Sequence, residues 1–250
     1  MIAVALRIGM VALTLAGGAA MAATDPKTAP VTRLKVAAPF RPAMSNWVET
    51  YAATPEGGFR RGNPAARVKL VEYGSLTCTH CRAFHGEAMR SLLGKYVASG
   101  KLSYEYRSFV LNGPDMGAAL VARCSGNAKS FFSALNSFYP DQPQWTQPFT
   151  TLSEDDRTRM AALPADKQIA ALAVTGKLDS YAATLGMSRA RFDACVGDKA
   201  QADRLIEIRQ AAVETYKVTG TPGFILNSQY LDDVFDWAAL EPKLQAALAP

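Results

Sequence analysis

The feature that most constrains this chain is a pair of cysteines three residues apart, in the segment Cys78-Thr79-His80-Cys81. The segment 68–73, rich in β-branched and aromatic residues, precedes the pair, and apolar residues recur about every four positions after it. This pattern predicts a strand, a short loop and then a helix that begins at the cysteines. Residues three apart lie on one helix face, so the two sulfurs can meet. The segment therefore predicts a reactive thiol pair at a helix N-terminus.

The two thiols should differ in reactivity because they differ in position along the helix. Cys78 lies at the helix start, where unpaired N–H groups and the positive end of the helix dipole favour a thiolate. Cys78 is therefore the expected exposed nucleophile, and Cys81 is the expected buried thiol that resolves a mixed disulfide. An imidazole at His80 would stabilise the Cys78 thiolate further, which makes the disulfide a stronger oxidant.

Other roles are open to a cysteine pair of this kind. It could be a purely structural disulfide. It could be half of a zinc site, but the sequence has no second Cys/His pair and His85 is the only other histidine, so we expect no metal. Haem attachment is excluded because Arg82, and not histidine, follows Cys81. Nucleic-acid binding is not expected, since the formal net charge is only +5 and no basic run occurs.

The rest of the sequence predicts an α/β fold with an inserted helical block. Apolar residues alternate with polar ones over 102–107, so a second strand follows the helix, and a βαβ unit makes the two strands parallel. The signals over 116–216 are almost entirely helical, and a loop at 219–223 leads into a strand hairpin and a final helix. We expect one sheet from 57–114 and 217–250, with 115–216 as the insertion.

The N-terminal segment has the pattern of a secretory signal peptide. One charged residue, Arg7, precedes an apolar stretch and a run of small residues that ends in Ala20-Met21-Ala22. We expect cleavage after Ala22, so that residues 1–22 are a signal peptide. The alternative is a membrane anchor, for which the apolar stretch is short. Residues 23–56, which are rich in proline, are expected to be an extended lead-in.

Export to an oxidising compartment would favour disulfide bonds between the four cysteines of the chain. Four cysteines allow three connectivities, and the close spacing of one pair favours Cys78–Cys81 together with Cys124–Cys195. The alternative for Cys124 and Cys195 is a pair of buried free thiols.

Glu72 is a candidate proton acceptor because it lies six residues before Cys78, inside an otherwise apolar strand. A carboxylate there would be partly buried under the cysteines and could accept a proton from Cys81 as a general base. The alternative is a glutamate at a sheet edge, paired with a lysine. We expect His85, four residues after Cys81, to lie on the helix surface.

These motifs resemble the thioredoxin-fold DsbA-like family of bacterial periplasmic thiol–disulfide oxidoreductases. The segment 68–81 is similar to that family's first core strand and active-site helix, and Gly220-Thr221-Pro222-Gly223-Phe224 is similar to its cis-proline loop. A helical insertion between two halves of a thioredoxin-like domain is also the family's arrangement. The resemblance therefore implies a thioredoxin-like α/β fold with an inserted all-helical domain.

The resemblance also implies roles for individual residues. The two cysteines of the motif would be the attacking and resolving thiols, with Thr79 and His80 as the dipeptide that tunes them. Pro222 would be a cis-proline that packs beside the disulfide, and the backbone of Thr221 would pair with an extended substrate segment. Thioredoxin-fold proteins similarly place an acid at the spacing of Glu72.

The function that the resemblance implies is that of a periplasmic oxidase. Its substrates would be reduced, unfolded exported proteins, and a membrane quinone-linked partner of the DsbB type would re-oxidise it. We expect a monomer whose redox-active disulfide serves without any other cofactor. A disulfide isomerase or reductase is the main alternative, which Thr79 and Thr221 leave open. A non-catalytic thioredoxin-fold chaperone that binds peptides is the other alternative.

Overall fold

The computed structural model describes residues 46–249 of the chain. The predicted signal peptide, residues 1–22, and most of the predicted lead-in lie outside the described residues. No helix among residues 46–249 is both long enough and apolar enough to cross a membrane.

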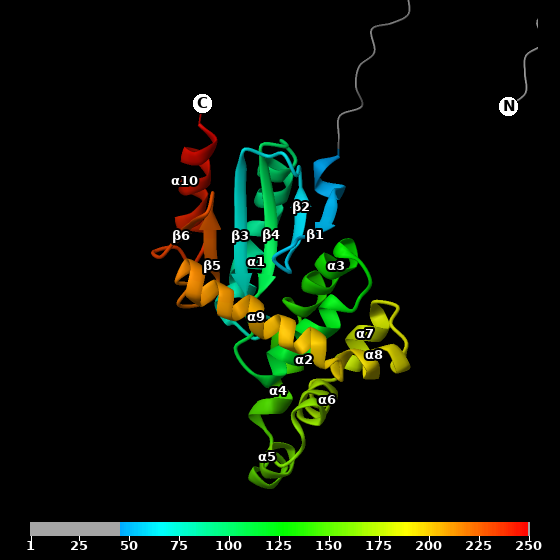
Figure 1. Cartoon of the computed structure of the whole chain (residues 1–250). Coiled ribbons are helices and arrows are strands. Elements are labelled where there is room, and N and C mark those ends of the chain that lie inside the picture. The colour runs from blue at the N-terminus through cyan, green and yellow to red at the C-terminus, as the bar shows by residue number, and fades with distance from the viewer. Residues whose placement is uncertain (1–45, 250) are drawn as a thin grey trace, which may run out of the picture. The chain divides into compact units, whose positions relative to one another are not determined.

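A six-stranded mixed sheet forms the centre of the fold, in the order β1-β2-β4-β3-β5-β6 (Figure 1). Neighbouring strands β3 and β4 are parallel, as the predicted βαβ unit requires, and the other pairs are antiparallel. The α/β fold class is therefore confirmed. The strands are β1 (Tyr51–Ala53), β2 (Phe59–Gly62), β3 (Val68–Gly74), β4 (Leu102–Ser108), β5 (Gly223–Leu226) and β6 (Gln229–Leu231).

The sheet begins earlier in the chain than predicted. Strand β1 lies inside the segment expected to be lead-in, and it pairs with β2, so that β2 is not the edge strand. A short 3-10 helix, η1 (Trp47–Glu49), precedes β1. A strand of three residues is too short to show a periodicity, but tertiary packing holds it, since the rings of Tyr51 and Phe132 lie 5.8 Å apart.

Helices cover both faces of the sheet (Figure 1). The active-site helix α1 (Thr79–Ser91) continues as a π-helix, η2 (Leu92–Val97), and packs with α10 (Trp237–Leu248) on one face. Side chains alternate along β3, so Leu70 points to this face and Tyr73 to the other. On the second face, Tyr73 packs against α9 (Lys199–Tyr216).

The predicted helical block contains eight helices in the described residues, and α2 is its centre. Residues 115–122 of α2 are all buried, and α2 contacts α3, α6, α7, α8 and α9. Besides α9, the helices of the block are α2 (Gly113–Arg123), α3 (Ala128–Phe138), α4 (Gln142–Thr150), α5 (Glu154–Ala161), α6 (Ala165–Thr175), α7 (Leu178–Thr184) and α8 (Arg189–Val196).

Helix α9 joins the block to the sheet. Ala202 and Leu205, in its first half, pack against α2, whereas Ile208 and Ala212 pack against the sheet. The sheet and the helical block thus belong to one compact unit. Helix α4 forms although it contains two prolines and has a largely polar sequence.

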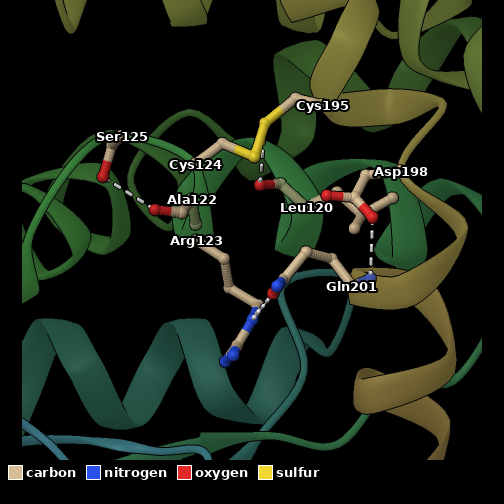
Figure 2. The surroundings of a disulfide bond; sticks show 8 residues. All are labelled: Leu120, Ala122, Arg123, Cys124, Ser125, Cys195, Asp198 and Gln201. Carbon is tan, nitrogen blue, oxygen red and sulfur yellow. Dashed lines mark hydrogen bonds between the residues drawn. A yellow bond between two sulfur atoms is a disulfide. The ribbon is translucent and has the colours of Figure 1, made fainter.

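A disulfide joins Cys124 and Cys195, 71 residues apart, as predicted (Figure 2). Cys124 is the C-cap of α2 and Cys195 lies in α8, with 6.2 Å between their Cα atoms. The adjacent Arg123 donates to the side chain of Gln201 in α9 and to the carbonyl of Gly57, which precedes β2. The disulfide therefore lies where the helical block meets the sheet.

Replacing both cysteines of this bond, Cys124→Ser with Cys195→Ser, should lower the free energy of unfolding by about 2–4 kcal/mol, because the bond restricts the unfolded chain. Denaturant unfolding of the oxidised protein measures the loss. Alkylation of Cys78 in the reduced variant should follow the same pH dependence as in the wild type. An unchanged unfolding midpoint would contradict a structural role for the bond.

Candidate active site

Cys78 is the N-cap residue of α1, and this position sets its surroundings. Its backbone is extended, the helix begins at Thr79, and its Sγ atom accepts a hydrogen bond from the backbone N–H of Cys81 at 3.4 Å. Both cysteines are free thiols, Cys78 half-buried and Cys81 buried. The arrangement agrees with the predicted nucleophile at the helix start and buried thiol one turn later.

The pKa values of the two thiols are shifted in opposite directions. A hydrogen bond from the Cys81 thiol lowers the pKa of Cys78 to about 5 against the opposing effect of burial. The side chain of Thr221 and the backbone N–H groups of Cys81 and His80 lower it further. Burial raises the pKa of Cys81 well above its usual range, and its hydrogen bond to Cys78 and the charge of Glu72 add to this. At neutral pH the pair therefore holds one thiolate and one thiol.

The loop before Cys78 is held by Asp115, a buried residue in the first turn of α2. Its carboxylate accepts hydrogen bonds from the hydroxyl of Ser75 at 2.6 Å, from Leu76 N–H at 2.8 Å and from Leu111 N–H at 2.9 Å. Burial raises the pKa of Asp115 to about 6, although these hydrogen bonds act in the opposite direction. The helical block therefore fixes the path by which the chain enters the active-site helix.

Gln142, at the start of α4, supports the same turn from another side. Its side-chain amide donates to the carbonyl of Leu76 at 2.7 Å and to the carbonyl of Cys78 at 2.9 Å. The sequence did not indicate Asp115 or Gln142, because each looks like an ordinary polar residue at a helix start. Only the tertiary fold brings them to the loop.

The loop at 219–223 forms the opposite wall of the site. The peptide bond between Thr221 and Pro222 is cis, and Pro222 is buried at the start of β5. The Sγ atom of Cys78 lies 3.2 Å from the carbonyl oxygen of Thr221, to which it donates a hydrogen bond when the thiol is protonated. The structure thus brings Thr221 and Pro222 beside Cys78, as the family resemblance implied.

Glu72 lies on the face of β3 that packs against α1, and its side chain is fully buried. Because β3 is flanked by β4 and β5, the alternative of a glutamate at the sheet edge is wrong. One carboxylate oxygen, Oε2, accepts a hydrogen bond from the hydroxyl of Tyr104 at 2.5 Å. Since Glu72 also acts on the pKa of Cys81, it lies close enough to influence that thiol.

The structure corrects the prediction for His85. Its side chain is only 6% exposed, and its Nε2 atom lies 3.4 Å from Oε1 of Glu72. The buried residues of α1 are Cys81, Phe84, His85 and Ala88, so a residue four positions after Cys81 shares the buried face. The spacing of four residues from Cys81 is thus itself a sequence signal for burial of His85.

Thr79 and His80 are exposed at the start of α1. The backbone N–H of His80 contributes to the low pKa of Cys78. Both side chains are accessible to a bound molecule, so their roles in tuning and substrate binding stay predictions. Among residues 46–249, no group of three or more His, Cys, Asp or Glu side chains gathers as a metal site.

The comparison with protein families gives a long match. A family model described as thioredoxin matches residues 54–246. That range is more than three quarters of the chain and contains both cysteines of the motif, Glu72 and the cis-proline loop.

Solved structures show the same architecture. The chain is similar to a protein described as a protein-disulfide isomerase from Novosphingobium aromaticivorans, with 33% identity and a TM-score of 0.74 over 77% of this chain and 98% of that one. It also resembles alpha-DsbA1 of Wolbachia pipientis, with 21% identity and a TM-score of 0.61 over 76% of this chain and 89% of that one. At the lower identity the likeness concerns the fold alone.

Two curated relatives come from Rickettsia, and each carries the name "Putative protein-disulfide oxidoreductase". The Rickettsia typhi protein is 28% identical over 166 residues and the Rickettsia bellii protein 26% identical over 183 residues. The matches cover 66% and 72% of this chain but 53% and 62% of the relatives. The chain therefore spans little more than half the length of these proteins.

The thiolate of Cys78 should be detectable by alkylation of the reduced protein as a function of pH. The rate with iodoacetamide should be half-maximal at about pH 5. In Cys81→Ala the midpoint should rise, because the largest single contribution to the low pKa is the hydrogen bond from Cys81. A wild-type midpoint near the value of a free cysteine, about 8.5, would contradict the predicted environment.

Asp115→Ala should lower the free energy of unfolding by at least about 2 kcal/mol at neutral pH, because it leaves buried donors unpaired. The folded pKa of about 6 exceeds the usual 3.8, so folding takes up protons between these values and wild-type stability falls as pH rises through them. The deficit of the variant should therefore be larger at pH 4 than at pH 7. Denaturant unfolding at both pH values measures this.

Asp236→Ala is the matched control for Asp115→Ala. Asp236 is an exposed N-cap of α10 that accepts a single backbone hydrogen bond, from Ala239 at 2.8 Å. Its loss should cost about 1 kcal/mol, as for an ordinary cap. Equal costs for the two variants would show that Asp115 is no more than a helix cap.

Proposed function

We propose that this chain, which belongs to the thioredoxin family and has its DsbA-like arrangement, introduces disulfide bonds into exported proteins by dithiol–disulfide exchange. The observation that carries the proposal is the low pKa of Cys78, about 5, beside a Cys81 thiol whose pKa is raised. Stabilising the Cys78 thiolate stabilises the reduced protein relative to its disulfide. A pair with a stable reduced form gives its disulfide readily to a substrate, so it acts as an oxidant.

The proposed reaction uses Cys78 as the electrophilic sulfur of the oxidised pair. A substrate thiolate attacks Sγ of Cys78, the bond to Cys81 breaks, and Cys81 takes up the electron pair and a proton. A second substrate thiolate then attacks the substrate sulfur of the mixed disulfide. The substrate disulfide forms and Cys78 leaves as a thiolate, which needs no proton at neutral pH. Two electrons pass from the substrate to the pair.

The loop at Thr221 and Pro222 would hold the substrate during this exchange. The Thr221 carbonyl lies beside the Cys78 sulfur, and its backbone can pair with an extended segment of an unfolded chain. The exposed side chains of Thr79 and His80 would contact the same segment. The predicted substrates are therefore reduced, unfolded proteins rather than small molecules.

The cellular setting forms part of the proposal. A signal peptide over residues 1–22 would direct the chain to the periplasm, where disulfides persist. A quinone-linked membrane protein of the DsbB type would restore the Cys78–Cys81 disulfide after each turnover. The chain would act as a monomer and need no cofactor besides this disulfide.

Disulfide isomerisation is the second candidate function. The relative from Novosphingobium aromaticivorans, 33% identical to this chain, is described as a protein-disulfide isomerase. An isomerase works from the reduced state, with the Cys78 thiolate attacking a wrongly paired disulfide. A stable thiolate favours that attack as well. The oxidase and the isomerase are therefore distinguished by which substrate the protein prefers, a reduced protein or one with wrongly paired disulfides.

The oxidised protein should accelerate disulfide formation in a reduced, unfolded protein that contains several cysteines, and Cys78→Ser should abolish this activity. The reduction potential of the pair should lie nearer to about −120 mV than to about −270 mV. Thiol titration during the reaction and equilibration with glutathione provide the two measurements. Activity confined to scrambled disulfides would favour the isomerase, and full activity of Cys78→Ser would refute both functions.

A further inference from the structure

Two buried polar atoms at the centre of the site have no hydrogen-bond partner within residues 46–249. These atoms are Oε1 of Glu72, on β3, and Nε2 of His85, on α1. They face each other at 3.4 Å, with side chains that are 0% and 6% exposed. Leaving a buried polar group unpaired is costly, so an unpaired couple of this kind calls for a functional explanation.

The chemistry at Cys81 requires a proton that the surrounding protein must deliver. Cys81 is completely buried, and so is Glu72, so neither can exchange protons with bulk water directly. The second oxygen of Glu72 is occupied by the hydroxyl of Tyr104. Burial and the charge of Glu72 raise the pKa of Tyr104 well above its usual range, so this phenol keeps its proton. Only Oε1 is free to pass a proton on.

His85 connects this oxygen to a pocket at the surface. The pocket has a volume of about 360 Å³ and lies between α1 and the C-terminal part of α3. His85 lines it together with Gly86, Asn136 and Pro140, which are exposed residues, so the pocket reaches solvent. An imidazole can carry a proton on either ring nitrogen. Of the titratable residues that line this pocket, which are Arg82, His85 and Tyr139, His85 is the one with a ring nitrogen 3.4 Å from Oε1.

We propose that His85 relays protons between the surface pocket and Glu72, and through Glu72 to Cys81. The inference rests on the proposed thiol–disulfide exchange and identifies a residue for its proton step. His85 does not touch the reacting sulfurs, so it is a positioning residue that acts through Glu72. The distance of 3.4 Å is long for a hydrogen bond, but contacts of this kind often tighten only during the reaction.

The proton balance of the step is simple. When a thiolate attacks Sγ of Cys78, the electron pair of the broken S–S bond goes to Sγ of Cys81. His85 gives a proton to the Glu72 carboxylate, Glu72 passes a proton to Cys81, and His85 regains one from water in the pocket. When Cys81 later attacks a mixed disulfide, the same proton returns by the reverse route.

The surroundings of His85 fix the ring without adding a competing charge. Its ring centroid lies 4.1 Å from that of Tyr139, at the end of α3, and 6.0 Å from that of Tyr106 on β4. The hydroxyl groups of these two tyrosines lie 2.8 Å apart and bond to each other. Burial raises the pKa of both phenols well above their usual range, so they stay neutral. Arg82 is the charged residue that lines the pocket.

The test measures how fast glutathione reduces the Cys78–Cys81 disulfide of the full chain, a reaction that needs no natural substrate. In His85→Gln and His85→Phe the release of Cys81 should slow by about tenfold or more, within the range of lost acid–base catalysis. Imidazole added to the buffer should enter the pocket and restore most of the rate. The midpoint of Cys78 alkylation should stay unchanged, which shows that the site is intact.

Glu241→Gln is the matched control, because Glu241 also accepts a tyrosine hydrogen bond, from Tyr96 at 2.6 Å, but lies away from the cysteines. Its rate should equal that of the wild type. Wild-type rates in the His85 variants, a slow rate that imidazole does not restore, or a shifted alkylation midpoint would each overturn the relay. A wild-type disulfide that does not react with glutathione would instead refute the proposed function.

Discussion

The carboxylate of Asp115 is the constraint on which the active site depends. It lies in the helical block, yet its hydrogen-bond donors include Ser75 and Leu76 of the loop that leads into α1. These bonds fix where the helix begins, and the helix start in turn decides which cysteine becomes the N-cap. Gln142 reinforces the same turn through the carbonyls of Leu76 and Cys78. The position of Cys78 therefore depends on the loop as much as on the helix.

One helical turn separates two thiols with opposite electrostatic surroundings. Cys78 is surrounded by donors, namely the Cys81 thiol, the side chain of Thr221 and two backbone N–H groups. Cys81 is enclosed by apolar side chains and faces the carboxylate of Glu72. Because a shared hydrogen bond lowers one pKa and raises the other, the two shifts reinforce each other. These opposite shifts support the proposed division into nucleophile and resolving thiol.

The sequence allowed much of this arrangement to be predicted because its signals are local. The strand before the cysteines and the helix start at Cys78 are encoded by neighbouring residues. The family resemblance supplied the cis bond at Pro222. Local pattern could not reveal strand β1 or the contacts of Asp115 and Gln142, which depend on residues far apart in the chain. The prediction that His85 lies on the helix surface was wrong, although its spacing from Cys81 did indicate the buried face.

Helix α9 packs its first half on α2 and its second half on the sheet, and α2 carries Asp115. The sheet and the helical block thus pack against the same helix. A chimera that grafts Cys78-Thr79-His80-Cys81 onto another thioredoxin scaffold would carry over the hydrogen bonds within the motif. It would lose the bonds of Asp115 and Gln142 to the loop before it unless the helical block is transferred together with the motif. The motif and its supports therefore form one structural unit, which includes the interface between the helical block and the loop before Cys78.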